Sequence, residues 1–510
     1  MAEINPQKIL DNYTFGFDQR IKVGERALLD FFELGSALGQ RLVQEDKRRI
    51  VVAGDGRVTT PALKHRFWEG LCQHDVNTID LGHNLPTPLA YAGLELYGAD
   101  AVAVITASHS SWEWNGIKIN IIKNRDSDGD GEDRRKDYSK SIRAYGKDVK
   151  KFYQALLQQG FGGGEKLTVA IDPLWGAYSD YAAEVLRSCG HTIICNEFLH
   201  NGIRGFPDDL EGYSSDPHKE KNLEHLIETV TESFNLDFGA AFDGDGDRVK
   251  FIDDQGEIVS EDEVTAIIAS YLISAERCAP DDKKQDKHHQ KKSKVVAEIK
   301  SSKLVKDIVE DNGGELVREQ TGRVYIKETM AKDPSIVFAG ELSGHYFYRR
   351  ELAGKPFYFV DTGEDGLFTL LLLGKILNEK GKKLSELRAA LPKYETSGEI
   401  RYTYRKGEEV NQVKPEIEKI IRYLTESYAQ DRDNFISIIR GDDVRIESTC
   451  GDYRSVVFRS SKNDPQKFTL VFEGKTAGSL REIKEDFLQK IHSGGYTCLE
   501  KGLGEVLNNI

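Results

Sequence analysis

The feature that most constrains the fold is a repeated alternation of short strand-like runs with helix-like segments. Patterns typical of buried strands lie at Ile50–Gly54, Ala101–Ile105, Lys166–Asp172 and Val295–Ile299. Helical patterns separate such runs, for example at Ser179–Ser188. Because strands that alternate with helices build sheets covered by helices, the rhythm predicts α/β domains with parallel or mixed sheets.

Length and composition narrow the class of protein further. At roughly 150 residues per domain, the 510 residues predict three or four domains. Apolar residues make up 39% of the chain, which excludes disorder of the chain as a whole. The longest apolar run, Leu367–Leu373 continuing to Leu377, predicts a buried helix. It is shorter than the ~20 residues that span a bilayer, and the first residues predict no secretory signal.

Charge and cysteine content set expectations about partners and compartment. Lys and Arg number 70 and Asp and Glu 84, so the net charge is −14. This balance argues against nucleic acid as the main partner, although local basic pockets can still bind an anionic substrate. The six cysteines form no C-x-x-C pair, so we expect reduced thiols in a cytoplasmic protein with no membrane partner.

Three segments interrupt the alternation. The glycine-rich stretch Gly160–Gly164 predicts a flexible hinge. Residues 280–294 lack apolar side chains and predict an exposed insertion, whose two histidines could bind a metal but are better explained as solvated. From about residue 394, strands and one long helix (Lys414–Gln430) predict an α+β terminal domain.

The sharpest chemical signal is a loop with three carboxylates at alternate positions, Asp243, Asp245 and Asp247. On a helix the middle one would point away, and on a strand the outer two would lie ~13 Å apart. A tight loop, which Gly244 and Gly246 permit, brings the oxygens round one ion. Such a site suits Mg²⁺ that holds a phosphate, and the adjacent Arg248 can grip a phosphate oxygen. The alternative is an acidic surface turn.

A second acidic loop, Asp126–Asp137, has carboxylates at spacings that resemble a calcium-binding EF-hand loop. A strand-like run (Ile117–Ile122), not a helix, precedes it. Because an EF-hand has a helix on both sides, a solvated acidic loop is the favoured interpretation.

A serine-rich loop, Thr106–Lys118, follows the strand-like run at Ala101–Ile105. It contains Ser108-His109 and ends in Asn115-Gly116-Ile117-Lys118, and no G-x-S-x-G elbow occurs. A Ser-His pair alone is a weak signal. Together with the aspartate loop, however, the pattern resembles the α-D-phosphohexomutase superfamily, with its phosphoserine loop T-A-S-H-N-P…N-G-x-K and its metal loop D-G-D-G-D-R.

Further motifs occur in the order found in that superfamily. They are Phe17–Arg20, Gly54–Arg57, Pro86–Pro88, Gly205–Pro207, Asp216-Pro217, Lys300–Ser302, Thr321–Arg323, Gly340–His345 and Arg459–Pro465. The resemblance therefore covers nearly the whole chain. It implies three related α/β/α domains with mixed sheets plus a C-terminal α+β domain around a central active-site cleft. We expect boundaries at 1–155, 156–258, 259–393 and 394–510.

The resemblance also implies roles for individual residues. The catalytic set is Ser108 as the phosphoserine, His109 and Lys118 for proton transfer and charge stabilisation, and Arg248 on the transferring phosphoryl group. The magnesium ligands are Ser108, Asp243, Asp245 and Asp247. The substrate contacts are Arg20, Lys300, Arg323, Glu341, Ser343, His345, Arg459, Ser461 and Asn463.

The implied reaction interconverts hexose 1-phosphate and hexose 6-phosphate, with mannose or glucose as the sugar. It uses Mg²⁺ and passes through a hexose 1,6-bisphosphate. The oligomeric state, monomer or dimer, is open.

Some positions depart from the motifs of the superfamily. Ser110 and Ser111 replace the usual Asn-Pro and compete with Ser108 as phosphorylation sites, while Arg323 stands where His is common. Leu342 favours the phosphomannomutase/phosphoglucomutase branch over phosphoglucosamine mutases. The sequence also leaves open a non-catalytic sugar-phosphate sensor and a phosphoserine phosphohydrolase.

Overall fold

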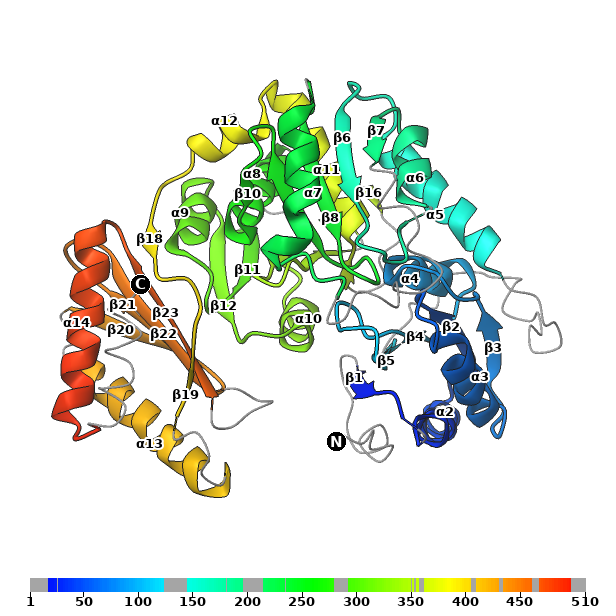
Figure 1. The fold of residues 1–510 in the computed structure, drawn as a ribbon, viewed down its shortest axis with the longest axis horizontal. Helices are drawn as coiled ribbons and strands as arrows, with labels where there is room; N and C mark the ends of the chain where they lie inside the picture. The colour runs from blue at the N-terminus through cyan, green and yellow to red at the C-terminus, as the bar shows by residue number, and fades with distance from the viewer. Residues whose placement is uncertain are drawn as a thin grey trace, which may run out of the picture. The chain divides into compact units, whose positions relative to one another are not determined.

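The structure is a computed structural model of the 510-residue chain (Figure 1). It describes residues 17–24, 26–122, 145–179, 181–195, 214–233, 235–278, 292–349, 351–352, 355–356, 362–404, 410–430, 434–460 and 467–496. The chain divides into two compact units. The first unit contains Met1–Ser293 and Lys327–Ala390, and the second contains Lys294–Ile326 and Leu391–Ile510.

The first sheet of the first unit has five strands in the order β1-β5-β4-β2-β3. These are β1 (Phe17–Lys22), β5 (Trp114–Ile121), β4 (Ala101–Ile105), β2 (Arg49–Gly54) and β3 (Asn77–Asp80). β2 runs parallel to β3 and β4, whereas β5 is antiparallel to both β4 and β1. The sheet is therefore mixed, with its antiparallel strands at one edge.

Helices α2 (Ala27–Gln44) and α3 (Thr60–Leu71) cover one face of this sheet. Phe31 and Phe67 pack there against Ile50 and Val52 of β2. Helix α4 (Thr87–Leu96) also packs against β2 and β4, and α5 (Gly146–Phe161) packs on α4. Helix α5 includes Gly160, so the glycine-rich stretch expected to be a hinge begins inside a helix.

The second sheet repeats this plan with the order β10-β9-β8-β6-β7. Its strands are β10 (Ile258–Val259), β9 (Val249–Asp253), β8 (Phe238–Phe242), β6 (Thr168–Asp172) and β7 (Thr192–Cys195). β6 runs parallel to β7 and β8, and β9 is antiparallel to its neighbours. Helices α6 (Ala182–Ser188) and α7 (Glu220–Glu232) follow β6 and precede β8. The shared plan confirms that these α/β regions are related in architecture.

A third mixed sheet contains a parallel pair and an antiparallel group. The parallel pair is β11 (Lys294–Glu298) and β12 (Glu315–Glu319); the antiparallel group is β13 (Ile336–Gly340), β14 (Tyr346–Arg349) and β17 (Thr362–Glu364). The accompanying helices are α8 (Glu261–Cys278), α9 (Lys303–Asp311), α10 (Arg323–Lys332), α11 (Gly366–Lys380) and α12 (Leu384–Ala389). A short pair, β15 (Glu351–Leu352) and β16 (Lys355–Pro356), also occurs.

Helix α11 confirms that the long apolar run is a buried helix, since almost every residue from Gly366 to Leu377 is buried. Asp365 caps its first turn by accepting hydrogen bonds from the backbone N–H of Leu367 and Phe368. Gly381 ends it in a left-handed conformation, φ 59°, which a glycine adopts without strain.

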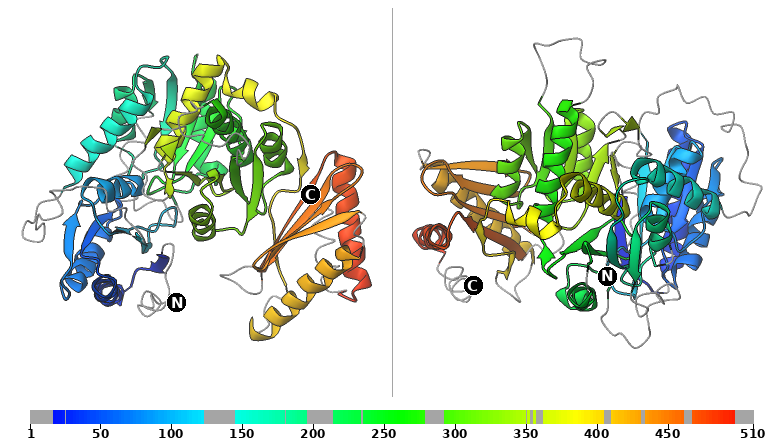
Figure 2. Two further views of the ribbon diagram at one scale, coloured as in Figure 1. Left: turned by 180° about the vertical axis from the view of Figure 1, so that it is seen from behind. Right: turned by 90° about the horizontal axis from the view of Figure 1, so that it is seen from above.

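The C-terminal region of the second unit is an antiparallel sheet with the path β18-β23-β22-β21-β20, and β19 also pairs with β23. Its strands are β18 (Glu395–Thr396), β19 (Ile400–Thr403), β20 (Phe435–Arg440), β21 (Asp443–Ser448), β22 (Arg454–Ser460) and β23 (Lys467–Gly474). Helices α13 (Val410–Ala429) and α14 (Ala477–Ser493) share one core with this sheet (Figure 2). Alternate strand residues such as Ile446 and Phe472 face that core, as the period of two requires.

The three mixed sheets and the antiparallel C-terminal sheet confirm the expected fold class. The four domain boundaries and the central cleft stay predictions. The expected insertion at 280–294 lies largely outside the described residues, and its last residue, Lys294, begins β11. The candidate calcium loop Asp126–Asp137 lies wholly outside them.

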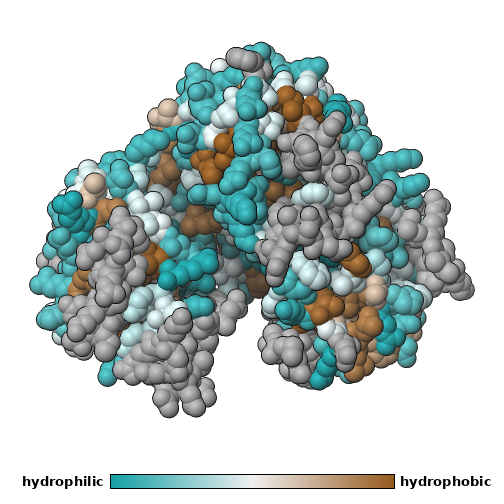
Figure 3. Space-filling model, viewed as in Figure 1, coloured by the Kyte–Doolittle hydropathy of each residue, from teal (hydrophilic) through white to brown (hydrophobic). Residues whose placement is uncertain are grey.

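The surface agrees with the acidic, polar composition. In the view of Figure 3, hydrophobic residues form separate groups between hydrophilic ones. Among the helices that the structure describes, none combines the length and hydrophobicity needed to cross a membrane.

Candidate active site

The serine loop follows β4, at the carboxyl end of a strand in the parallel part of the first sheet. Ligand sites of α/β sheets commonly lie at this end of the strands. Ser108 is buried and has a positive φ of 52°, a conformation that non-glycine residues rarely adopt. Its backbone N–H donates to Oγ1 of Thr106 at 2.9 Å. The surrounding structure therefore holds the serine in a strained, defined position.

Arg57 fixes the serine loop through hydrogen bonds to its backbone carbonyl groups. One terminal nitrogen of its guanidinium donates to the carbonyl oxygens of Ser108 (2.8 Å) and Ser110 (2.7 Å). The other donates to the carbonyls of Ser111 (2.9 Å) and Trp114 (3.0 Å). Asp55 accepts from Nε of Arg57 at 3.0 Å. Sequence reasoning matched this Asp-x-Arg motif but gave it no role, because nothing in the motif shows which carbonyls the arginine reaches.

The aspartate loop, Asp243–Asp247, follows β8, the corresponding strand of the second sheet. Its three aspartates are buried, and one oxygen of each lies within 4.8 Å of the others. Gly246 has φ 76°, and a Cβ on Gly244 would lie 2.4 Å from the carbonyl oxygen of Ser108. The glycines thus allow the loop to curl and to touch the serine loop. The acidic surface turn is excluded, because all three carboxylates are buried.

Hydrogen bonds and ion pairs join the two loops. The Ser108 hydroxyl donates to Oδ2 of Asp243 at 2.7 Å. Lys118 on β5 places Nζ 2.7 Å from Oδ2 of Asp245 and also pairs with Asp247. The serine, the lysine and all three aspartates that the sequence singled out are therefore together.

The electrostatics of the loop favour an added cation. Burial, and then the neighbouring Asp245 and Asp247, raise the pKa of Asp243 well above its usual range. Oδ1 of Asp245 is buried and has no hydrogen-bond partner among the described residues. Crowded carboxylates with an unsatisfied oxygen are the donor set that Mg²⁺ prefers, so the residues present fit this ion.

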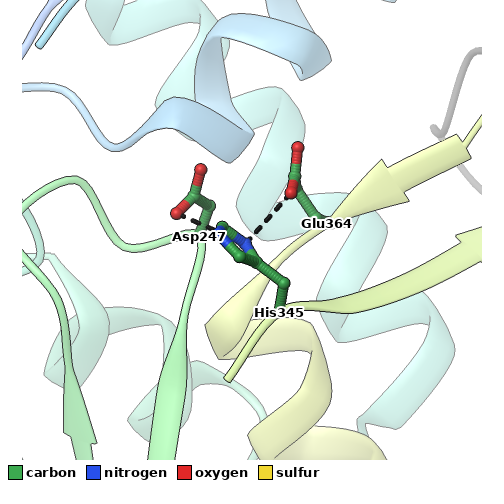
Figure 4. Close-up of side chains that lie close together, drawn as sticks. All are labelled: Asp247, His345 and Glu364. Atoms are coloured by element: carbon green, nitrogen blue, oxygen red, sulfur yellow. Dashed lines mark ion pairs between the residues drawn. The ribbon is translucent and has the colours of Figure 1, made fainter. Parts of the chain in front are cut away.

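Arg248 and His345 meet beside the aspartate loop. Nε of Arg248 donates to Nε2 of His345 at 2.9 Å, and the two residues also form a backbone bridge. Nδ1 of His345 lies 3.0 Å from Glu364 and 3.7 Å from Asp247 (Figure 4). Burial lowers the pKa of His345, so the imidazole is neutral at physiological pH.

The predicted sugar loop lies on the same side, between β13 and β14. The backbone N–H of Glu341 donates to the carbonyl of His345 at 3.0 Å, and the hydroxyl of Ser343 donates to the Glu341 carboxylate at 3.2 Å. Glu341 is buried, and its charge helps raise the pKa of Arg248. The structure thus brings this loop to Arg248.

His109 and Arg20 complete the surroundings of the serine. Nδ1 of His109 lies 3.2 Å from Oγ of Ser108. Burial, followed by the positive charges of Arg248 and Arg20, lowers the pKa of His109 far below its usual value, so the ring is neutral. Arg20 on β1 donates to the hydroxyl of Ser110 at 3.4 Å.

Comparison with known proteins decides the family. Models of phosphoglucomutase/phosphomannomutase α/β/α domains I, II and III match residues 13–134, 144–256 and 260–394. The chain is a member of the α-D-phosphohexomutase superfamily.

Relatives within the superfamily carry different sugar names. A phosphoglucosamine mutase of Thermoanaerobacter pseudethanolicus is 30% identical over 77% of this chain and 85% of its own. A phosphomannomutase/phosphoglucomutase of Pseudomonas putida is 26% identical over 78% of this chain and 81% of its own. These relatives agree on the superfamily, but their names differ in the sugar and so do not specify the sugar on which this chain acts.

Solved structures agree with the fold. A phosphoglucomutase/phosphomannomutase family protein of Burkholderia thailandensis has a TM-score of 0.73 at 20% identity, with 96% of this chain and 98% of that chain covered. The N-acetylphosphoglucosamine mutase of Aspergillus fumigatus, solved with GlcNAc-6P and magnesium, has a TM-score of 0.55 at 14% identity, covering 89% and 80%.

Residues that sequence reasoning missed support the aspartate loop of this phosphohexomutase. The Thr87 hydroxyl donates to Oδ2 of Asp245 at 2.8 Å. The ring of Tyr178 packs under Gly246, and its hydroxyl donates to Asp365, as does that of Tyr153. Only Thr87 lay in a recognised motif; Tyr153 and Tyr178 stand 90 and 65 positions before Asp243 and belong to none.

The remaining predicted contacts of the phosphohexomutase belong to the second unit. Nζ of Lys300 pairs with Glu399 at 2.6 Å, and Arg459 on β22 lies 3.8 Å from Asp443. Arg323 begins α10. Ser461 and Asn463 lie outside the described residues.

Proposed function

We propose that this phosphohexomutase interconverts hexose 1-phosphate and hexose 6-phosphate, with mannose or glucose as the sugar, through a phosphoserine at Ser108. The observation that carries the proposal is the 2.7 Å contact of the Ser108 hydroxyl with a buried three-aspartate loop. A nucleophilic oxygen beside a divalent-cation site is the arrangement that phosphoryl transfer requires.

Asp243, Asp245 and Asp247, with the phosphoserine, would hold Mg²⁺. The magnesium in the Aspergillus fumigatus structure supports this assignment. When bound, the ion supplies positive charge that stabilises the phosphoryl oxygens.

Side chains of this protein would carry the phosphoryl group and move the proton. In the proposed cycle, phosphorylated Ser108 transfers its phosphoryl group to a hydroxyl of hexose 1-phosphate. The P–O bond to serine breaks as a bond to the sugar oxygen forms, and the sugar proton leaves to a nearby base. The neutral His109, 3.2 Å from Oγ, is the candidate to accept it and to pass a proton to the freed Oγ of Ser108, while Lys118, ion-paired with two aspartates, would stabilise the developing charge. The hexose 1,6-bisphosphate then reorients and returns its other phosphoryl group to Ser108.

Cations and hydrogen-bonding groups would position the substrate. The planar fork of Arg248 matches the oxygens of the transferring phosphoryl group. The carboxylate of Glu341 and the hydroxyl of Ser343 suit adjacent sugar hydroxyls, and we keep His345 and Arg20 as neighbouring contacts. For the second phosphate we propose Lys300, Arg323, Arg459, Ser461 and Asn463.

The test is a coupled assay on the purified protein with Mg²⁺ and a trace of glucose 1,6-bisphosphate. Glucose, mannose and glucosamine 1-phosphates are compared in wild type, Ser108→Ala and the matched control Ser110→Ala. Formation of 6-phosphate by wild type and Ser110→Ala, but not by Ser108→Ala, is the expected result. Activity that survives in Ser108→Ala and is lost in Ser110→Ala would move the nucleophile.

A second candidate is a phosphoglucosamine mutase. The relative at 30% identity carries that name, which favours it. Turnover of glucosamine 1-phosphate alone would establish this candidate. Release of free phosphate, or binding without turnover, would instead support a phosphohydrolase or a sugar-phosphate sensor.

A further inference from the structure

A buried chain of polar contacts runs from Arg248 away from the serine loop. It passes through His345 and Glu364 to Lys327 on α10, and Figure 4 shows its middle part. The side chains of His345, Glu364 and Lys327 are 4%, 0% and 6% exposed. Neither Glu364 nor Lys327 belongs to the residues assigned above.

The proton positions along this chain follow from donor and acceptor types. Nε of Arg248 always carries hydrogen, so Nε2 of His345, 2.9 Å away, must offer a lone pair. A neutral imidazole then carries its proton on Nδ1. That nitrogen lies 3.0 Å from Oε2 of Glu364, and Nζ of Lys327 lies 2.8 Å from Oε1 of the same carboxylate, both at ion-pair distance but without the angles of an aligned hydrogen bond.

A metal ion between Asp247, His345 and Glu364 is the competing interpretation, since their ligand atoms lie close enough together. A metal on Nδ1 would require the proton on Nε2, where it would face the N–H of Arg248. The ion pair with Lys327 already neutralises Glu364. Donor chemistry therefore favours a protonated Nδ1 over a metal.

The contact with His345 uses only one of the five N–H groups of Arg248. Among the described residues, neither terminal amino group of Arg248 makes a hydrogen bond. These two groups form the fork that matches a phosphoryl group. The imidazole thus fixes the rotation of the guanidinium while it leaves the fork for an anion.

We propose that Glu364 and Lys327 are positioning residues that hold His345 as the Nδ1-H tautomer, so that His345 aligns Arg248 on the transferring phosphoryl group. This inference rests on the proposed mutase function. It gives His345 a role in aligning Arg248, in addition to the neighbouring substrate contact proposed above.

The kinetic test is a double-mutant cycle between Glu364→Leu and Arg248→Lys, which removes the fork but keeps the charge. Glu364→Leu alone is expected to lower kcat about 30–100-fold, with KM for the sugar phosphate changed less than about three-fold. In the Arg248→Lys background the same substitution is expected to cost less than about two-fold. An equal loss in both backgrounds would overturn the proposal.

A matched double variant, Glu364→Gln with Lys327→Met, guards against misfolding of Glu364→Leu. It removes both charges and keeps an acceptor for the Nδ1 proton, so kcat is expected to fall several-fold less than in Glu364→Leu. A loss as large as that of Glu364→Leu, in protein with an unchanged unfolding transition, would contradict the proposal.

A spectroscopic readout separates this inference from the proposed function. In protein labelled with ¹⁵N-histidine, the His345 signal is identified by its absence in His345→Gln. Wild type should show the Nδ1-H tautomer, and Glu364→Leu should lose it; an Nε2-H tautomer in wild type would refute the assignment. An inactive wild type would overturn the mutase alone, because the tautomer is read without substrate.

Discussion

Two clusters of buried charge, one in each unit, use the same residue types to opposite effect. In the first unit, the aspartate loop crowds three carboxylates round Lys118 and Arg248. In the second unit, a cluster that we call the scaffold cluster combines two arginines and two glutamates. Its members are Arg318, Arg445, Glu447 and Glu473.

The scaffold cluster is balanced, and its groups are paired. Arg445 on β21 donates to Glu447 (2.5 Å) and Glu473 (2.9 Å), and to the carbonyl of Ile299 (3.1 Å). Glu473 in turn accepts from the backbone N–H of Lys303 at the start of α9. These contacts fasten the C-terminal sheet to the loop that holds Lys300.

One carboxylate in each cluster, Glu447 and Asp243, has its pKa shifted in the opposite direction to the other. Burial opposes the charged form of Glu447, but Arg445 and Arg318 outweigh it and lower its pKa to about 2. Burial and like charges instead raise the pKa of Asp243. The paired charges of the scaffold cluster hold its strands and loops in place. The excess carboxylate charge of the aspartate loop instead favours the binding of a cation.

The largest effect should come from the centre of the first cluster. Ser108→Ala removes the proposed phosphoryl carrier, so turnover of the best hexose 1-phosphate should fall by about a thousand-fold or more. The coupled assay measures this loss, and the thermal unfolding transition should be little changed. If Ser108→Ala kept a tenth of the wild-type activity, the serine beside the aspartate loop would not be the phosphoryl carrier, and the first cluster would have no demonstrated role in the chemical step.

In the scaffold cluster, the large effect should be on stability and not on the chemical step. Arg445→Met leaves two buried carboxylates without their main partner, so unfolding should become easier by about 3–5 kcal/mol. Urea unfolding followed by circular dichroism measures this change. A kcat at saturating substrate that falls more than about ten-fold would contradict a purely structural role.

Acid should weaken the scaffold cluster in a defined window. Because folding lowers the pKa of Glu447 from 4.5 to about 2, its contribution is present above pH 4.5 and is lost as pH falls toward 2. The difference in unfolding free energy between wild type and Glu447→Gln should thus shrink by up to about 3 kcal/mol across that window. A difference independent of pH between 5 and 2.5 would show that the charge of Glu447 contributes nothing.

Magnesium should stabilise the first cluster. At 100 times its dissociation constant, the ion should raise the unfolding free energy of wild type by about 2.7 kcal/mol. Asp245→Asn should lose most of this gain, while Glu447→Gln, altered in the scaffold cluster, should keep it. Equal stabilisation of all three proteins would mean that the ion binds elsewhere.

The smallest expected effect is an increase in stability, which is unusual for the substitution of a buried residue. Without metal, Asp243→Asn relieves repulsion in the aspartate loop. It keeps Oδ1 as acceptor for the backbone N–H groups of Gly246 and Arg248 and presents its NH2 group as a donor to the Ser108 hydroxyl, so it should stabilise the protein by about 1 kcal/mol. Most buried substitutions destabilise, so an unfolding temperature below that of wild type in the presence of a chelator would refute the idea of excess charge.

Sequence patterns identified the residues of the first cluster but none of the second. Asp243–Asp247 and Ser108 stand in short motifs with distinctive turn glycines, and their chemistry is local to those motifs. Arg445 and Glu473 lie in ordinary alternating strands, where a charged residue predicts a solvated face. In the structure Arg445 and Glu473 are buried, so the local pattern does not indicate the cluster.

The same contrast holds within the active site. The motifs gave Lys118 and Arg248 general roles, but not the ion pair of Lys118 with two aspartates or the contact of Arg248 with His345. Glu364 carried no signal at all, since a single carboxylate before a helix is common. Arg57 lies in a motif that the sequence matched, but the motif assigned no role to this arginine.

The sequence by itself determined the alternation of strands and helices, the curl of the aspartate loop and the membership of a superfamily. Periodicity and turn chemistry act over a few residues, so they can be read locally. Only the tertiary structure decided the partners of each charge, because Ser108 and Asp243 are 135 positions apart, and Arg248 and His345 are 97 apart. Strand order brings such residues together, and burial then fixes the protonation and alignment on which the chemistry depends.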